Sequence, residues 1–153
     1  IGTNMFIRQD EIRPDDRYYW VTANENGSYT ATPKELEDRE EVDEDGNPRF
    51  VQVIDRTDPA NLIMVNTTKR LISKGLKSIH IAQVKQTANS ILAQTDWMVI
   101  RKAERNVDIP ADTVAYRASV VAKATELEAA ISVVTTVEAL KELNLSFPNN
   151  GVI

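Results

Sequence analysis

The sequence predicts an α+β protein, with β-hairpins in its N-terminal part followed by a C-terminal helical hairpin or small helical bundle. In the first third of the chain, short runs of aromatic and β-branched residues alternate with turns rich in Asn and Gly. Apolar residues then recur at helical spacing through most of the remaining sequence. We therefore divide the 153 residues into a β-rich region, residues 1–60, and a helical region, residues 61–153. This length is sufficient to bury a hydrophobic core without disulfides.

The first predicted hairpin joins two short strands whose residues favour a pleated surface. Residues 18–22 and 28–32 form these strands, and residues 24–27, of sequence Asn-Glu-Asn-Gly, supply the turn. Core packing is the first interpretation for the large aromatic side chains of this chain. The alternative is an interface anchor, because aromatic residues contribute much of the energy of protein association. Tyr18 and Trp20 are accordingly candidate interface residues.

A second hairpin is predicted around residues 45–48, whose sequence Asp-Gly-Asn-Pro is typical of a tight turn. Residues 40–42 lie before this turn and residues 50–54 after it. The later strand is apolar on both faces apart from Gln52, so we expect it to be covered on both sides. Residues 32–41 are expected to form an exposed linker or a single helical turn.

The first two predicted helices lie in the middle of the helical region. A first helix is predicted over residues 79–92, with Gly75 as its upstream limit. A second helix begins after Thr95 or Asp96, which we expect to cap it, and stops near Val107. It stops there because the residue that precedes a proline disfavours helical conformation.

A third, longer helix is predicted from Pro110 or Ala111 to about Ile131, and a capped short helix from Thr135 to about Leu143. Each helix has one apolar face, so the helices must pack on one another or on a partner. The predicted apolar stripe of the third helix contains Val114, Arg117, Val121, Ala124, Glu128 and Ile131, widened by Val120, Leu127 and Ala130.

The net charge of −5 conceals an uneven distribution along the chain. Residues 34–59 carry a net charge of −6 and residues 60–108 a net charge of +5. Two solvated faces are one interpretation, and charge-complementary assembly, within one chain or between copies, is another. Nucleic-acid binding is not expected, because aromatic residues are not interleaved with the basic ones.

The residues needed for most enzymatic and metal chemistry are scarce. The chain has no cysteine and a single histidine, His80, for which we expect a surface or interface role. Asp43, Asp45 and Asn47 alternate as at the start of an EF-hand loop, but Pro48 occupies the position that requires glycine. No glycine-rich phosphate loop and no nucleophile elbow is present. We therefore expect a protein that is not an enzyme and that has no cofactor and no metal.

Membrane and secretion signals are also missing from the sequence. No stretch approaches the ~20 consecutive apolar residues that span a bilayer, and residues 1–4 do not begin a signal peptide. The absence of cysteine is consistent with a reducing compartment. We expect no membrane partner.

One pattern in the helical region resembles a known family. Residues 92–117 contain L-x-x-T-D-W, then R-x-x-E, then I-P and finally Y-R. This pattern resembles a helical C-terminal module of small tailed-bacteriophage proteins, which are tail-fibre, baseplate or tail-fibre-assembly proteins. The resemblance covers roughly residues 76–132, with weaker similarity across residues 40–54. It implies a structural protein of the virion tail or an assembly factor, and it carries no catalytic residues.

Together these observations predict a structural component of a bacteriophage tail, in the baseplate or tail-fibre attachment region, that acts through protein–protein assembly. The alternative is a tail-fibre assembly chaperone that is not retained in the particle, and an enzyme ranks last. The expected partners are other phage tail proteins and further copies of the chain, without nucleic acid. The expected location is the virion tail, after synthesis in the host cytoplasm. The candidate interface residues of the helical region are Trp97, Ile100, Arg101, Tyr116 and Arg117.

Overall fold

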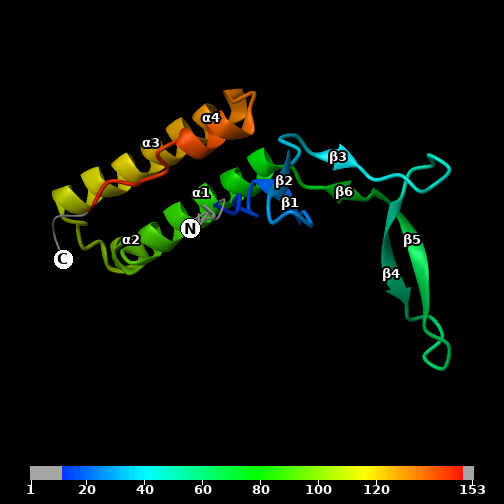
Figure 1. Cartoon of the computed structure of the whole chain (residues 1–153). Coiled ribbons are helices and arrows are strands. Elements are labelled where there is room, and N and C mark those ends of the chain that lie inside the picture. The colour runs from blue at the N-terminus through cyan, green and yellow to red at the C-terminus, as the bar shows by residue number, and fades with distance from the viewer. Residues whose placement is uncertain (1–11, 150–153) are drawn as a thin grey trace, which may run out of the picture. The chain divides into compact units, whose positions relative to one another are not determined.

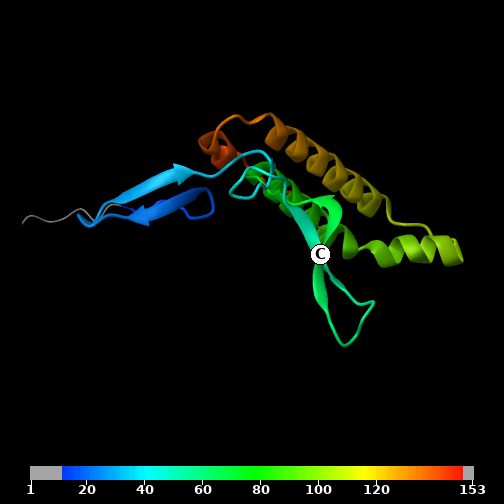
Figure 2. The same cartoon turned by 90° about the vertical axis from the view of Figure 1, so that its right-hand side faces the viewer.

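A computed structural model describes residues 12–149 and confirms the predicted α+β class, in which antiparallel strands precede helices (Figures 1 and 2). The chain divides into two compact units between Glu35 and Leu36. The predicted boundary, between residues 60 and 61, instead falls in the loop between two paired strands. The β-rich part of the second unit continues to Ser73, and the helices follow it.

The first unit contains the predicted N-terminal hairpin, which is confirmed. Strand β1 (Tyr19–Ala23) pairs with β2 (Tyr29–Pro33) in antiparallel register. The turn closes where the backbone N–H of Asn24 donates to the carbonyl of Ser28 at 2.9 Å. Gly27 has φ 84° in this turn, a conformation that glycine adopts without steric penalty.

The strands of the second unit pair differently from the prediction. Strand β4 (Phe50–Asp55) pairs with β5 (Ile63–Arg70), and the two-residue strands β3 (Arg39–Glu40) and β6 (Ile72–Ser73) pair with each other. The predicted hairpin around residues 45–48 survives only as a turn closed by a single bridge between Val42 and Pro48. The apolar start of β5 offers β4 a longer and more β-prone partner than the acidic residues 40–42.

The expectation that residues 50–54 are covered on both sides is wrong. The Val53 and Ile54 side chains are 46% and 48% exposed. In both views the β4–β5 hairpin projects away from the helices, so no helix covers either of its faces (Figures 1 and 2).

The helices of the second unit form its core. Helix α1 (Leu76–Ala93) begins directly after Gly75, and α2 (Asp96–Arg105) follows it. Helix α3 (Ala111–Val133) begins after Pro110 and runs antiparallel to α1, as Figure 1 shows, and α4 (Val137–Glu142) follows. These boundaries agree with the predicted ones within a few residues. The buried apolar side chains belong to α1 (Leu76, Val84, Ala88), α3 (Val120, Leu127, Ile131) and the chain around α4 (Val134, Val137, Leu140).

The predicted apolar stripe of α3 needs correction, because Val114 and Val121 are exposed. The buried positions share one side of the helix, and Val121 lies about 100° around the axis from Val120. Valine occurs on both sides of this helix, so apolar spacing alone does not select the side that packs on α1.

The predicted role of His80 at the surface is also wrong. Its side chain lies on the buried face of α1 and His80 is only 7% exposed. The His80 Nδ1 atom lies 2.8 Å from the carbonyl oxygen of Leu76. A carbonyl oxygen only accepts hydrogen bonds, so Nδ1 carries the proton and donates it. The imidazole therefore satisfies a polar group inside the core and does not face solvent.

The cap of α4 lies one residue later than predicted. Thr136, not Thr135, is the N-cap residue, and its Oγ1 accepts a hydrogen bond from the backbone N–H of Ala139 at 3.1 Å. Both threonines fit the sequence preference for this position, so the backbone conformation decides between them.

Candidate interaction surface on helix α2

The acidic and basic segments of the chain meet where β6 leads into α1. The Asp38 carboxylate lies 2.6 Å from Lys74 Nζ, and Glu37 lies 2.5 Å from Lys77 Nζ. Asp38 also accepts a hydrogen bond from the backbone N–H of Gly75 at 2.9 Å, just before the first turn of α1. Part of the predicted charge complementarity is thus satisfied within one chain.

Helix α2 differs from its neighbours because none of its residues is buried. Trp97 is 51% exposed and Ile100 is 56% exposed. Core packing, the first interpretation for the large aromatic side chains, therefore does not hold for Trp97. Isolated helices shorter than ~12 residues are marginal in water, so contacts at the two ends must maintain this ten-residue helix.

Arg117 of α3 fixes the N-terminal end of α2. Its Nη1 donates to the carbonyl of Leu92 and to Thr95 Oγ1, both at 2.7 Å. Its Nη2 donates to the Asp96 carboxylate at 2.9 Å. Thr95 occupies the N-cap position, but its side chain accepts no helix N–H and instead contacts the guanidinium. The three contacts hold the elbow between α1 and α2 against α3.

The C-terminal end of α2 is fixed by local contacts. Asn106 adopts a left-handed conformation with φ 55°, and its backbone N–H donates to the Lys102 carbonyl at 3.0 Å. The Lys102 ammonium group then donates to Asn106 Oδ1 at 2.9 Å and to the Asp108 carboxylate at 2.6 Å. The hydrogen bond from Lys102 lowers the pKa of Asp108. Both ends of the helix are therefore defined, while its middle remains accessible.

Three side chains on one face of α2 form what we call the α2 surface: Trp97, Ile100 and Arg101. They are spaced i, i+3 and i+4, so they lie next to one another on the helix. The guanidinium carbon of Arg101 lies 4.8 Å from the centre of the Trp97 ring, within range of a cation–π interaction. The Arg101 Nε atom is buried and has no hydrogen-bond partner within residues 12–149. The α2 surface thus combines exposed apolar area with a guanidinium that forms no ion pair with another described residue.

The other candidate interface residues have different environments. Tyr116 is half-buried and its hydroxyl donates to the carbonyl of Pro148 at 3.2 Å, so it fastens the segment after α4 to α3. In the first unit Trp20 is exposed on β1, with Lys34 Nζ 4.6 Å from its ring centre, and Tyr18 is half-buried. Within the second unit, the structure brings Arg117 close to the elbow of α2, whereas the hydroxyl of Tyr116 contacts the segment after α4.

A second exposed apolar region was not predicted from the sequence. It lies on the β4–β5 hairpin, at the end nearest the connecting loop. The outer edges of both strands lack a partner strand in the described part of the chain. Only the apolar run at residues 62–65 signalled this region in the sequence. The exposed side chains are Val53, Ile54, Leu62, Ile63 and Met64.

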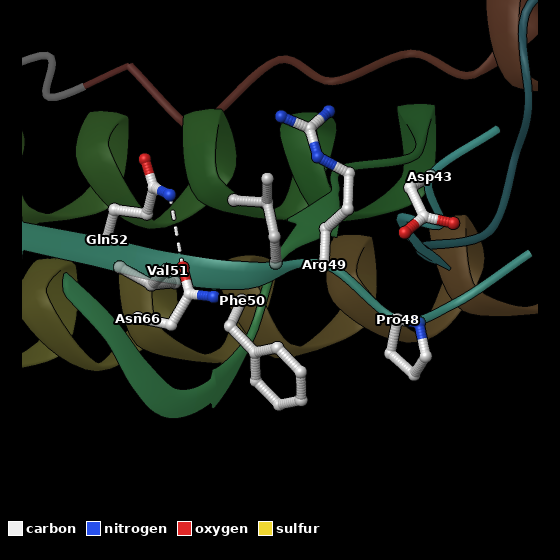
Figure 3. A pocket seen from close by; sticks show the side chains of 8 residues that line it. Asp43, Pro48, Arg49, Phe50, Val51, Gln52 and Asn66 are labelled. Atoms are coloured by element: carbon white, nitrogen blue, oxygen red, sulfur yellow. Dashed lines mark hydrogen bonds between the residues drawn. The ribbon is translucent and has the colours of Figure 1, made fainter. Parts of the chain in front are cut away.

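An open hollow of about 430 Å³ lies where the acidic turn meets β4, but its side chains do not converge on a common point. Figure 3 shows Arg49 and Phe50 extending from opposite sides of the strand. Gln52 donates to Asn66 at 3.1 Å, and Arg49 donates to the Glu41 carboxylate at 3.0 Å. The polar groups of the hollow are therefore largely occupied by one another or by adjacent residues.

The described residues form neither a metal site nor a membrane-spanning helix. Between residues 12 and 149, no three His, Asp or Glu side chains are grouped so that they could hold a metal ion. No helix in this range has the length and apolar character needed to cross a membrane. The Asp43 carboxylate, which the sequence places in an EF-hand-like pattern, accepts hydrogen bonds from the backbone N–H groups of Asp45 and Asn47 at 3.0 and 2.8 Å. It closes a turn.

Comparison with known proteins adds no relative. No protein-family model matches the sequence, and neither a curated protein nor a solved structure matches it.

Proposed function

We propose that the chain is a structural assembly protein of a bacteriophage tail, in the baseplate or tail-fibre attachment region, and that it binds its neighbours through the α2 surface. The observation that carries this proposal is Trp97, half exposed in the first turn of a helix whose two ends are fixed. The T-D-W, I-P and Y-R pattern, which resembles that of tail and tail-assembly proteins, supports the choice of a phage tail.

The α2 surface has the chemistry of a binding hot spot. Tryptophan and arginine are enriched among residues whose truncation weakens protein association most. A helix that is already formed loses little conformational entropy on binding, so more of its contact energy appears as affinity. An amphipathic helix of this kind binds into an apolar groove of a partner through residues at i, i+3 and i+4 spacing.

The β4–β5 hairpin favours the second candidate, a tail-fibre assembly chaperone. Its exposed apolar residues and unpaired strand edges are features that bind extended segments of another chain. A chaperone would use this hairpin transiently, whereas a structural protein would bury it permanently in the particle.

Mass spectrometry of particles purified from the phage or prophage that encodes the chain tests the proposal. We expect the wild-type chain in stoichiometric amount, and at least about tenfold less of a Trp97→Ala, Ile100→Ala variant, because a loss of ~1.4 kcal/mol in binding reduces affinity tenfold. Val121→Ala, which shortens an exposed valine of α3, is the matched control and should be incorporated normally. Equal incorporation of all three chains would contradict the role of the α2 surface. Absence of the wild-type chain from particles whose fibres require its gene would identify a chaperone.

A further inference from the structure

The turn between β3 and β4 presents acidic side chains from a well-defined backbone. We call residues 42–48 the acidic turn. The Asp43 carboxylate accepts two backbone N–H groups of the turn, and the Asp43 N–H donates to the Asn47 carbonyl at 2.9 Å. Gly46 adopts φ 83°, which completes the reversal of the chain. The backbone of the acidic turn is therefore arranged before any partner binds.

The outward side chains of the acidic turn have no partner in the described structure. The carboxylates of Glu44 and Asp45 are exposed and make no hydrogen bond or ion pair within residues 12–149. Val42 is 56% exposed, and Pro48, bridged to it across the turn, is exposed as well. The acidic turn thus places two free carboxylates beside two exposed apolar residues.

The α2 surface is the complement of this arrangement. It places one guanidinium, which has no counter-charge among residues 12–149, beside two exposed apolar residues, Trp97 and Ile100. A carboxylate next to Arg101 would supply the missing counter-charge, and charge-assisted hydrogen bonds are among the strongest that proteins form. Val42 and Pro48 offer exposed apolar side chains that Trp97 and Ile100 can contact.

The acidic turn and the α2 surface of one chain lie too far apart to meet. Both belong to the unit that follows Glu35, and Figure 1 shows the turn between β3 and β4 at the opposite end of this unit from α2. We propose that the acidic turn of one copy binds the α2 surface of a second copy, with Glu44 and Asp45 facing Arg101. This inference rests on the proposed assembly role of the α2 surface.

Such a contact is head-to-tail, because each copy uses a different surface at each end. Repetition of a head-to-tail contact produces a ring where the rotation closes and an open chain where it does not. A contact made by so few residues on each surface is weak by itself. It becomes weaker still as salt screens the charges. Multiple copies in an assembly would strengthen it.

Sedimentation velocity with two complementary variants of the full chain tests the inference. The double variant Trp97→Ala, Arg101→Ala removes the α2 surface and keeps the acidic turn. The double variant Glu44→Lys, Asp45→Lys removes the carboxylates of the acidic turn and keeps the α2 surface. We expect the average mass of the wild type to rise with concentration, and to rise less at high salt. Each variant alone should associate at least about tenfold more weakly than the wild type. An equimolar mixture should form dimers and nothing larger, because only one matched pair of surfaces remains.

Controls separate this contact from misfolding and from general charge effects. Arg56→Ala and Glu25→Lys change exposed charges elsewhere, and both should associate like the wild type. If the Trp97→Ala, Arg101→Ala variant is unstable, the single variant Trp97→Ala takes its place, provided that its melting temperature equals that of the wild type. A wild type that remains monomeric, a mixture that remains monomeric, or a variant that associates like the wild type would overturn the inference. Because this test uses purified chain and the test of tail function uses particles, the failure of one is distinguishable from the failure of the other.

Discussion

Asp38 connects the acidic segment of the chain to the start of α1. Its carboxylate accepts hydrogen bonds from Lys74, Ser78 and the backbone of Gly75, and in this order they lower its pKa from 3.8 to about 2. An unfolded chain lacks these bonds and would protonate Asp38 at a higher pH. The ionised form of Asp38 therefore stabilises the fold above its unfolded pKa, and this contribution disappears as pH falls toward the folded pKa.

The Asp38→Asn variant tests this contribution. We expect it to be less stable than the wild type at neutral pH. The difference between the two proteins should shrink as pH falls from about 4 to about 2, because the wild-type carboxylate is protonated over that interval. Urea denaturation at several pH values measures the difference. A difference that is independent of pH across this interval would contradict the assignment.

Gly75 lies where the backbone leading into α1 passes closest to residues 36–37. It is buried, and a Cβ atom at this position would overlap the backbone of Leu36 and Glu37. We expect Gly75→Ala to destabilise the fold by about 2 kcal/mol or more, since backbone cannot move aside as a flexible side chain can. Gly46→Ala is the comparison, because open space surrounds Gly46 and only its positive φ penalises a side chain, by about 1 kcal/mol. Urea denaturation measures the unfolding free energy of both variants. A smaller loss for Gly75→Ala than for Gly46→Ala would contradict this prediction.

At the scale of elements, α2 depends on a residue of another helix. Arg117 is the only described side chain that joins the α1 carbonyl end, the N-cap residue and the first residue of α2 through hydrogen bonds. The planar guanidinium makes these bonds in a fixed geometry that a lysine ammonium cannot reproduce. The elbow and the α2 surface are therefore positioned together by α3.

Arg117→Lys should loosen α2 while the α1–α3 core remains. We expect the free energy of unfolding to fall by about 1–3 kcal/mol, since each hydrogen bond to a charged group contributes that order of stability. Amide hydrogen exchange should become faster in α2 and remain unchanged in the buried middle of α3 around Leu127. Uniform acceleration across both helices would show that Arg117 supports the whole core.

At the scale of the whole molecule, the two compact units differ in what stabilises them. The second unit has a buried core of helices, whereas the described part of the first unit is a two-stranded hairpin. A single two-stranded hairpin is marginally stable at best in water. The cooperative unfolding of the chain should therefore belong to the second unit.

Deletion of residues 1–35 tests this division. We expect the shortened chain to melt within about 2 °C of the full chain, because none of the described residues it removes, 12–35, is buried. Differential scanning calorimetry measures the melting temperature and enthalpy of both chains. A decrease of about 10 °C or loss of the transition would show that the N-terminal unit is part of the cooperative fold.

Local signals made much of this fold predictable. Gly75 and Pro110 mark helix ends because glycine and proline act through their own backbone geometry. The first hairpin was predictable because both strands and the turn lie within 15 residues of sequence. The partner of β4 was not predictable, because pairing depends on a strand elsewhere in the chain and several segments compete for it.

The candidate site was only partly predictable, for a related reason. The spacing of Trp97, Ile100 and Arg101 establishes that they share a face, but it does not say whether that face packs inside or outside. Large aromatic residues are buried on average, and that tendency led to the wrong environment for Trp97. Arg117 contacts the elbow from another helix, 25 residues after Leu92 and 22 residues after Thr95 in the sequence.

The most direct test of the central claim, that the α2 surface serves association and not folding, is the unfolding free energy of a Trp97→Ala, Ile100→Ala variant. Urea denaturation of the isolated chain, at a concentration where it is monomeric, measures this quantity. Because both side chains are half exposed, we predict a loss of less than about 1 kcal/mol. A loss of about 3–5 kcal/mol, as for a truncated core tryptophan, would contradict the claim and return Trp97 to the core.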